Sequence, residues 1–310
     1  IYGACFIPVH LNNVLISGDE GLHFMQLAES RGYPRNLCGW IKGIYGIVIS
    51  HEDIDTVIAV TQGDCSNTHA LMETLEIKGK QVIPFAYPYD RSRKLLRDQM
   101  EELAERLGAS WDDVQLWKKK LDIVRKKAHR IDRLTWDEGR ATGLENHIAL
   151  VSCSDFEGDS DAFGRKLDAQ IEEISSRSER RQGTRLGLIG VPPMMTDLHD
   201  TIESYGAHIV FNEVSRQFSM PFDTDDIVEQ YLRYTYPYSV FQKIDDIKAE
   251  IERRHIKGII HYVQSFCFRQ IEDLIYRERL NIPILTLEAG DAFSTDQRQK
   301  MRIEAFVEML

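Results

Sequence analysis

The 310-residue sequence lacks the features that would place it in a membrane or on nucleic acid. No apolar run approaches the roughly 20 residues that a membrane-spanning helix needs. Acidic residues outnumber basic ones by 49 to 38, which gives a formal net charge of −11, whereas a nucleic-acid binder usually presents a basic face. We therefore expect neither a membrane protein nor a nucleic-acid partner. An acidic surface suits docking of a basic protein, although most such surfaces only keep a protein in solution.

Several common catalytic motifs are also missing. The sequence contains no G-x-G-x-x-G, no G-x-x-x-x-G-K-[ST], no H-E-x-x-H and no G-x-S-x-G. A dinucleotide fingerprint, a P-loop, a zincin site and a nucleophile elbow are therefore not supported. If ATP takes part in the function, a partner protein must bind it.

Cysteine is scarce, with five residues at wide and irregular spacing. An odd number at such spacing does not fit the disulfide framework of a small secreted protein, so we expect a cytoplasmic protein with reduced thiols. Residues 1–11 show neither the basic segment nor the cleavage site of a signal peptide. The first residue is Ile rather than Met, which leaves open whether residues precede it.

Short apolar runs alternate with amphipathic stretches at both ends of the chain, which predicts an α/β fold with mostly parallel sheets. We expect a first α/β domain at 1–110, a helical connector at 111–182 and a second α/β domain at 183–310. A polar run at 175–184 marks the second boundary. The expected strands are residues 2–8, 55–61, 81–85, 185–190, 207–211, 258–263 and 282–287.

Helix starts are indicated by capping residues. Asp19, Ser66 or Asn67, and Ser110 each precede an amphipathic stretch. Residues 142–145 have the T-x-x-E form of a capping box, so we interpret the following GLENHIALVSC as helix, although its IALV segment alone also suits a strand. A last helix is expected at 294–310. The basic groups KKK and RKKAHR, at 118–120 and 125–130, have helical spacing, which favours a solvated helix face over a binding patch.

Three cysteines stand at the ends of the expected αβ units: Cys38, Cys65 and Cys267. Cys65 and Cys267 each follow an apolar run and open an amphipathic stretch. In an open α/β sheet this position lies at the carboxyl ends of the strands, where ligands bind. A helix N-terminus also favours the thiolate, the form that binds metal. We therefore predict a soft-metal site, with an iron–sulfur cluster as the first hypothesis.

Simpler interpretations of the cysteines remain open. Free cysteine is often buried only for packing, and we favour that role for Cys5 in its apolar run and for Cys153 near a helix end. Zinc held by three cysteines is an alternative, although zinc sites usually contain a local C-x₂₋₄-C pair that is absent here. His69 lies one helical turn after Cys65, where a surface or supporting role is expected, and His261 is expected at a strand end.

Two further segments are candidates for ligand contact. GVPPMM, at 190–195, follows an expected strand and is either a ligand-facing loop or a stiff connector, because its prolines restrict the backbone. LEAGD, at 287–291, ends the last expected strand. Its carboxylates, Glu288 and Asp291, are candidates for proton transfer or for capping the next helix.

The cysteine segments and the C-terminus resemble a known family. Cys38 with Lys42 is similar to that family's first cysteine motif, and Cys65 with Glu73 to its second. At the end of the chain, GIIHYVQSFCFRQIEDL, IPILTLEAGD and QRQKMRIEAFVEML follow the family's closing pattern of a cysteine, a strand ending in acids and an R-x-E-A-F-x-E helix. Over nearly its whole length the chain resembles subunits of 2-hydroxyacyl-CoA dehydratases, ATP-dependent benzoyl-CoA reductases and related double-cubane cluster proteins.

The resemblance implies two flavodoxin-like parallel-sheet domains joined by a helical segment, with the cluster in the cleft between them. It also implies Cys38, Cys65 and Cys267 as the thiolate ligands, with Cys5 and Cys153 as candidates for additional ones. The implied cofactor is an iron–sulfur cluster, either [4Fe-4S] or a double-cubane [8Fe-9S]. No catalytic acid or base is carried over from the family, because none aligns clearly.

The resemblance also implies partners and an activity. A separate ATP-hydrolysing activator, with its own iron–sulfur cluster, would drive single electrons into this protein. A homologous subunit would complete a homodimer or heterodimer, and the substrate would be an acyl-CoA. We expect a 2-hydroxyacyl-CoA dehydratase (a lyase) or an acyl-CoA reductase. The alternatives are a double-cubane-type reductase of small molecules and a non-catalytic electron-transfer or scaffold subunit.

Overall fold

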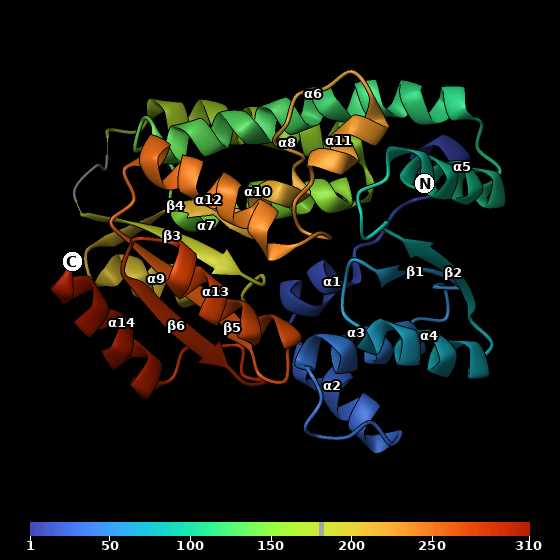
Figure 1. Cartoon of the computed structure of the whole chain (residues 1–310), viewed down its shortest axis with the longest axis horizontal. Coiled ribbons are helices and arrows are strands. Elements are labelled where there is room, and N and C mark those ends of the chain that lie inside the picture. Colours follow the sequence, from blue (N-terminus) through green and yellow to red (C-terminus); the bar gives the residue numbers. More distant parts are fainter. Residues whose placement is uncertain (180–182) are drawn as a thin grey trace. The chain divides into compact units, whose positions relative to one another are not determined.

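The computed structural model describes residues 1–179 and 183–310 (Figure 1). The chain forms two compact units, each built from three stretches of sequence. Unit 1 comprises Ile1–Lys120, Phe222–Ser239 and Ser265–Phe268, and unit 2 comprises Leu121–Pro221, Val240–Gln264 and Arg269–Leu310. Every strand pair in the described ranges is parallel. The expected α/β class with parallel sheets is therefore confirmed.

Unit 1 contains a two-stranded parallel sheet surrounded by helices. Strands β1 and β2 pair in register from Thr56 opposite Gln81, with an irregularity between Val60 and Gln62. Helices α4 and α5 contact this sheet, and α3 packs against α2 and α4. A sheet of two strands is marginal by itself, so these helices must supply most of the apolar cover. The elements of unit 1 are η1 (Tyr2–Ala4), α1 (Leu11–Ser17), α2 (Gly21–Ser30), α3 (Gly39–Ser50), β1 (Thr56–Gln62), α4 (Asn67–Ile77), β2 (Gln81–Ala86), α5 (Arg93–Leu107) and α11 (Ile227–Arg233).

A tyrosine cluster attaches the segment that carries α11 to the rest of unit 1. Tyr87 follows β2, and its ring lies 6.4 Å from that of Tyr231, 6.3 Å from that of Tyr234 and 5.9 Å from that of Tyr238, measured between centroids. Aromatic pairs at such separations add to the energy of simple burial. Packing between distant parts of the chain therefore builds unit 1.

Unit 2 contains a four-stranded parallel sheet with the order β4-β3-β5-β6 (Figure 1). Counted within the unit this order is 2-1-3-4, the arrangement of the first four strands in flavodoxin-like sheets. All seven residues of β5 are buried, as expected for a central strand covered on both faces. The elements of unit 2 are α7 (Gly143–Val151), η2 (Ser152–Ser154), η3 (Phe156–Gly158), α8 (Ser160–Ser176), β3 (Thr184–Gly190), α9 (Leu198–Ser204), β4 (Ala207–Asn212), α10 (Glu213–Phe218), α12 (Val240–Arg254), β5 (Gly258–Gln264), α13 (Glu272–Arg279), β6 (Ile284–Ala289) and α14 (Gln297–Met309).

Helices α12 and α13 build the core of unit 2 together with the sheet. Ile244 and Ile247 of α12 pack with Phe211 of β4, Ile259 of β5 and Tyr276 of α13. Helices α7 and α9 contact β4 and each other, and α14 contacts α9 and β6. Two elements cross the boundary between the units: the 26-residue helix α6 (Trp111–Trp136) and the short turn η4 (Phe268–Ile271).

The strand predicted at residues 2–8 is wrong. The structure has a 3₁₀ turn at Tyr2–Ala4 and no strand there, and α1 follows. Cys5 has a φ of +61°, in the left-handed region, which interrupts an extended run. Phe6 and Ile7 are 54% and 73% exposed. The apolar run that suggested a buried strand therefore contributes little to the core.

The other strands were predicted within a few residues. The last one begins at Ile284, after Pro283, and ends at Ala289 rather than at 287. A proline cannot donate to a sheet ladder, which explains the later start. The capping box at Thr142 and Glu145 is confirmed, so the IALV segment is helical. Helix α2 begins after Glu20 rather than after Asp19. Helix α14 is capped by Asp296 and begins at Gln297, three residues after the predicted start at 294.

The polar run at 175–184 includes residues 180–182, which lie outside the described residues. Helix α8 ends at Ser176, within the first two residues of the run, and β3 begins at its last residue, Thr184. No helix in the described ranges is long and apolar enough to cross a membrane.

Candidate metal centre

Cys38, Cys65 and Cys267 all belong to unit 1, although they are distant in sequence. Cys38 is the N-cap residue of α3. Cys65 lies in the turn that connects β1 to α4, and Cys267 lies in the short segment after β5 that belongs to unit 1. None of the three cysteines forms a disulfide in the described part of the chain. The predicted position at helix starts and after strands is therefore what the structure has.

The Cys38 thiol lies within electrostatic range of both other thiols. Burial is the main cause that raises its pKa, to about 12, and the nearby Cys267 and Cys65 raise it further. The backbone N–H groups of Trp40 and Ile41 donate to its sulfur and oppose this effect. Its side chain is 5% exposed. A proton or a metal ion must therefore neutralise this sulfur at neutral pH.

The turn that carries Cys65 depends on a glycine. Gly63 has a φ of +99°, and a Cβ built there would lie 2.9 Å from atoms of both Pro237 and Tyr87. The turn is thus packed directly against the tyrosine cluster. After the turn, the Cys65 carbonyl accepts the Thr68 N–H at 3.0 Å, which begins α4. Both the conformation and the close packing require glycine at position 63.

Cys267 follows a residue in an unusual conformation. Phe266 has a φ of +65° and is 58% exposed. A bulky residue in the left-handed region is uncommon and costs free energy, so such conformations often occur at functional sites. The strained turn presents Cys267 directly before η4.

The donors at this site are thiols, which are ligands for soft metals. The described residues contain no group of three His, Cys, Asp or Glu side chains close enough to bind one metal ion. A cluster spreads its iron atoms, so its thiolates stand farther apart than the ligands of one ion. The sulfur atoms of Cys38, Cys65 and Cys267 are the donor type that iron–sulfur clusters require, and both other cysteines are near enough to Cys38 to raise its pKa.

Cys5 and Cys153 have different surroundings. Cys5 is exposed. Cys153 is in unit 2, 2% exposed, and its thiol donates to the Ala149 carbonyl at 3.5 Å. Burial raises its pKa to about 12, and the charged groups that modulate this value are Arg125 and Asp155 rather than another cysteine. These contacts describe a packing residue.

The two polar residues grouped with the cysteines in the sequence differ in burial. The Lys42 side chain is fully buried, and its Nζ donates to Glu29 Oε1 at 2.8 Å and to the Arg35 carbonyl at 3.3 Å. It links α3, which Cys38 opens, to α2. Glu73 is exposed on α4 and makes no hydrogen bond or ion pair in the described part of the chain.

The histidines have structural partners. His69 Nε2 is 2.8 Å from the Thr61 carbonyl, a contact between α4 and β1. His261 was expected at a strand end and instead lies inside β5, where its Nδ1 is 2.8 Å from Asp273 Oδ1. Burial lowers the pKa of His261, and Asp273 opposes this shift.

Segment 190–195 is a buried connector. Gly190 has a φ of +109°, and Met194 and Met195 are at most 1% exposed. The Met194 N–H donates to the Tyr262 hydroxyl at 3.0 Å. These contacts favour the stiff-connector interpretation. Neither Glu288 nor Asp291 caps the next helix, because Asp296 does so.

A buried charge cluster in unit 2 was not predicted. Glu213 is 1% exposed, and neither carboxylate oxygen has a hydrogen-bond partner among the described residues. Burial is the main cause that raises its pKa to about 7; Lys243 lowers it, and Asp246 and Glu272 raise it. Lys243 is itself buried and contacts Glu272 Oε2 at 3.4 Å. In the sequence, these residues are only charged side chains near helix starts, and such side chains usually lie in solvent.

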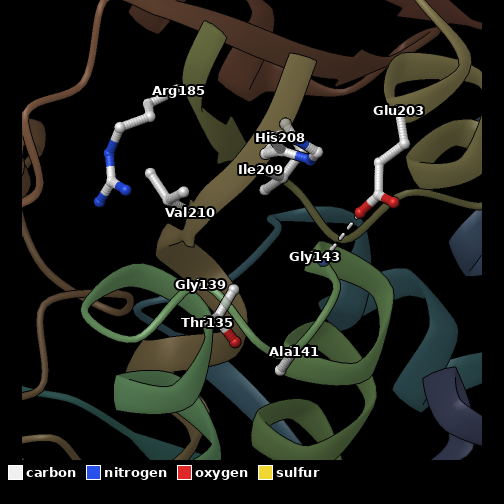
Figure 2. Close-up of a pocket in the computed structure, with 9 residues that line it drawn as sticks. All are labelled: Thr135, Gly139, Ala141, Gly143, Arg185, Glu203, His208, Ile209 and Val210. Atoms are coloured by element: carbon white, nitrogen blue, oxygen red, sulfur yellow. Dashed lines mark hydrogen bonds between the residues drawn. The ribbon is translucent and has the colours of Figure 1, made fainter. Parts of the chain in front are cut away.

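A cavity of about 20 Å³ lies at the amino ends of β3 and β4, near Arg185 and His208. Figure 2 shows the residues that line it. The Gly143 N–H donates to Glu203 Oε1 across its wall at 3.3 Å. This volume accommodates about one water molecule. Ligands of open α/β sheets bind at the opposite, carboxyl ends. The cavity is therefore not a substrate site.

The chain was compared with known protein families. A family model for the 2-hydroxyglutaryl-CoA dehydratase D-component matches residues 1–310, the whole chain. The chain belongs to this family. The predicted resemblance to 2-hydroxyacyl-CoA dehydratase subunits is thereby confirmed. A search of curated proteins finds no match.

Membership of the D-component family identifies the chain as a dehydratase component. Proteins of this family bind iron–sulfur clusters and work with other subunits. The three cysteines of unit 1 have the chemistry that such a cofactor requires, because thiolate is the ligand for iron in these clusters.

Proposed function

We propose that this chain is the cluster-binding subunit of a cytoplasmic 2-hydroxyacyl-CoA dehydratase, with Cys38, Cys65 and Cys267 as the ligands of one [4Fe-4S] cluster. The observation that carries the proposal is the placement of Cys38, Cys65 and Cys267 in unit 1, with both other cysteines close enough to Cys38 to raise its pKa. Thiols that come together from three distant parts of the sequence are placed to share one ligand.

The residues around Cys38 would hold its sulfur as a thiolate. The N–H groups of Trp40 and Ile41 point at the sulfur and stabilise its negative charge. Burial opposes that charge, so binding of iron must release the proton of the thiol. The ion pair between the buried Lys42 and the partly exposed Glu29 holds the first turn of α3 against α2 and thereby maintains these two donors.

Three protein ligands leave one position of a cubane without a thiolate. When bound, such a cluster supplies single electrons and an iron that acts as a Lewis acid. Either property suits the removal of a hydroxyl group from an acyl-CoA thioester, which is the reaction class of the family. We propose a single cubane rather than a double one, because Cys153 is buried in unit 2 and Cys5 is exposed.

We propose two kinds of partner from the family membership. A separate activator protein with its own cluster would hydrolyse ATP and supply the electrons, since the sequence has no P-loop. A homologous subunit would complete a homodimer or heterodimer.

Anaerobic purification with iron and sulfide analysis tests the proposal. We expect iron and acid-labile sulfide in equal amounts, in the stoichiometry of one cubane per chain. Cys38→Ser, Cys65→Ser and Cys267→Ser should each lose most of the iron, whereas Cys5→Ser and Cys153→Ser should retain it.

Two outcomes contradict the proposal. One is substoichiometric iron in the wild-type protein after reconstitution with iron and sulfide. The other is a full cluster in all three serine variants of the proposed ligands. Thermal unfolding of each variant shows whether lost iron merely reflects a lost fold.

A further inference from the structure

A basic pocket in unit 2 is separate from the cysteines. Its volume is about 390 Å³, within the range of about 300–1,000 Å³ typical of small-molecule sites. Helix α6 forms one wall with Lys126, Arg130 and Arg133. The remaining lining residues are His129, Asp132 and Trp136 of α6, Arg216 of α10, Pro221, and Arg253 of α12.

The spacing of the cations gathers them on one side of α6. Residues 126, 130 and 133 are related by i, i+4 and i+7, which places them on one helix face. The sequence suggested that this face is only solvated. The structure adds Arg216 and Arg253 from two other helices to the same pocket, in a chain whose net charge is −11.

The only carboxylate that lines the pocket is already committed to an inner contact. Asp132 accepts from Arg254 through both oxygens, each at 2.7 Å, and from the Asn146 amide at 2.8 Å. Both Asp132 oxygens are therefore occupied by these inner contacts, although Arg216 also lowers the pKa of this carboxyl. Arg216 itself pairs with Asp246 at 2.7 Å and with Glu250 at 3.3 Å, so we expect ligand contacts mainly from Arg130, Arg133 and Arg253.

Several guanidinium donors of the wall remain available to a ligand. Arg133 is exposed, and its guanidinium makes no hydrogen bond in the described part of the chain. Arg253 uses Nε and Nη2 on Glu250, at 3.2 and 2.6 Å, and is 47% exposed. Arg130 pairs with Glu138 through Nη1 alone. Arginine has five N–H donors, so both paired residues retain unused ones.

We propose that this pocket binds an organic polyphosphate, such as a nucleoside diphosphate or the phosphorylated adenosine of a coenzyme. Guanidinium groups match phosphate oxygens in pairs, and several arginines from different helices suit more than one phosphate group. The volume exceeds the needs of a lone phosphate, and Trp136 provides an aromatic surface in the same pocket. The inference does not depend on the proposed cluster.

Calorimetric titration of the anaerobically purified protein tests the pocket with four probes: pyrophosphate, ADP, coenzyme A and 3′-dephospho-coenzyme A. We expect at least one of them to bind, with an affinity that falls as salt is added. Tighter binding of coenzyme A than of its dephospho form identifies the 3′-phosphate as part of the ligand. Equal binding of ADP and both coenzyme forms identifies the diphosphate, and equal binding of pyrophosphate identifies phosphate groups alone.

Charge reversal tests the location of the site. Arg133→Glu should lower the affinity for the probe by about 10-fold or more, as expected for loss of a charge-assisted contact. Arg165→Glu on α8 makes the same charge change at an exposed position outside the pocket and is the matched control. Lys126→Glu is a second pocket variant, in case Arg133→Glu does not fold.

The proposal is overturned if none of the four probes binds the wild-type protein, or if the pocket variants bind as the wild type does. It is also overturned if Arg165→Glu weakens binding as much as Arg133→Glu. The iron content of Arg133→Glu should equal that of the wild type, so loss of polyphosphate binding is distinguishable from failure of the cluster assignment.

Discussion

Lys42 Nζ lies 2.8 Å from Glu29 Oε1, and the Lys42 side chain is fully buried while that of Glu29 is 26% exposed. This unequal burial predicts unequal effects of mutation. Glu29→Ala removes the carboxylate partner of a buried ammonium and should destabilise the protein by about 2 kcal/mol. Lys42→Met removes the buried charge itself and leaves Glu29 partly in water, so we expect a change within about 1 kcal/mol.

Urea unfolding of both variants measures the difference. A larger loss of stability in Lys42→Met than in Glu29→Ala would show that the ammonium has a role beyond this ion pair.

Gly63→Ala should disturb the turn that carries Cys65. The new Cβ would lie 2.9 Å from Pro237 and Tyr87, and the backbone has a φ that L-residues avoid. We expect a loss of about 2–3 kcal/mol in stability and reduced iron content. Gly79→Ala is the matched control, because Gly79 also has a positive φ, of +79°, but nothing lies within 4 Å of the added Cβ.

The control should lose only about 1 kcal/mol and keep its iron. Equal effects of the two substitutions on iron content would mean that close packing at Gly63 is unimportant for Cys65.

Glu213→Gln should make stability less dependent on pH. Burial raises the pKa of Glu213 from 4.5 to about 7 in the folded protein, so the folded state binds more protons than the unfolded state between these values. The contribution of Glu213 to the wild-type free energy of unfolding should therefore be largest below pH 4.5. It should fall as the pH rises from 4.5 to 7 and level off above pH 7. Because one pKa unit corresponds to about 1.4 kcal/mol, this group should lower the free energy of unfolding by about 3 kcal/mol over the whole range.

Urea unfolding between pH 5 and pH 8 tests this expectation, with Glu252→Gln at an exposed position of α12 as the control. The gain of stability in Glu213→Gln relative to the wild type should increase with pH. A gain that is the same at both ends of the range would place the pKa of Glu213 at its ordinary value.

Cys38 should be the least reactive thiol of unit 1 in protein without iron. A pKa of about 12 and 5% exposure leave only about one thiolate in ten thousand at pH 8. Exposed Cys5 should be alkylated by iodoacetamide first, as read by mass spectrometry of peptides after a time course. Alkylation of Cys38 at the rate of Cys5 would contradict the burial of its sulfur.

Local patterns were enough to predict the elements of unit 2. Its strands are β-branched runs between helical stretches, and each forms at nearly the predicted residues. The capping box at Thr142 decided between helix and strand for a segment whose apolar residues suit both. The predicted strand at 2–8 failed because periodicity does not reveal that Cys5 adopts a left-handed conformation.

The position of the three cysteines at helix starts was predictable, because a helix start has a local signature. Their surroundings were not. The Cys65 turn packs against Pro237, and this contact depends on the return of 222–239 to unit 1, which no feature of that segment announced. The gathering of Glu213, Lys243 and Glu272 likewise follows from strand order, since each residue lies at the start of a different helix.

Anomalous scattering at the iron edge, from crystals grown without oxygen, is the most direct test of the central assignment. We predict iron peaks within bonding distance of the Sγ atoms of Cys38, Cys65 and Cys267 in the same molecule. Iron bound by other side chains, with any of these three sulfurs too far away to coordinate it, would contradict the account.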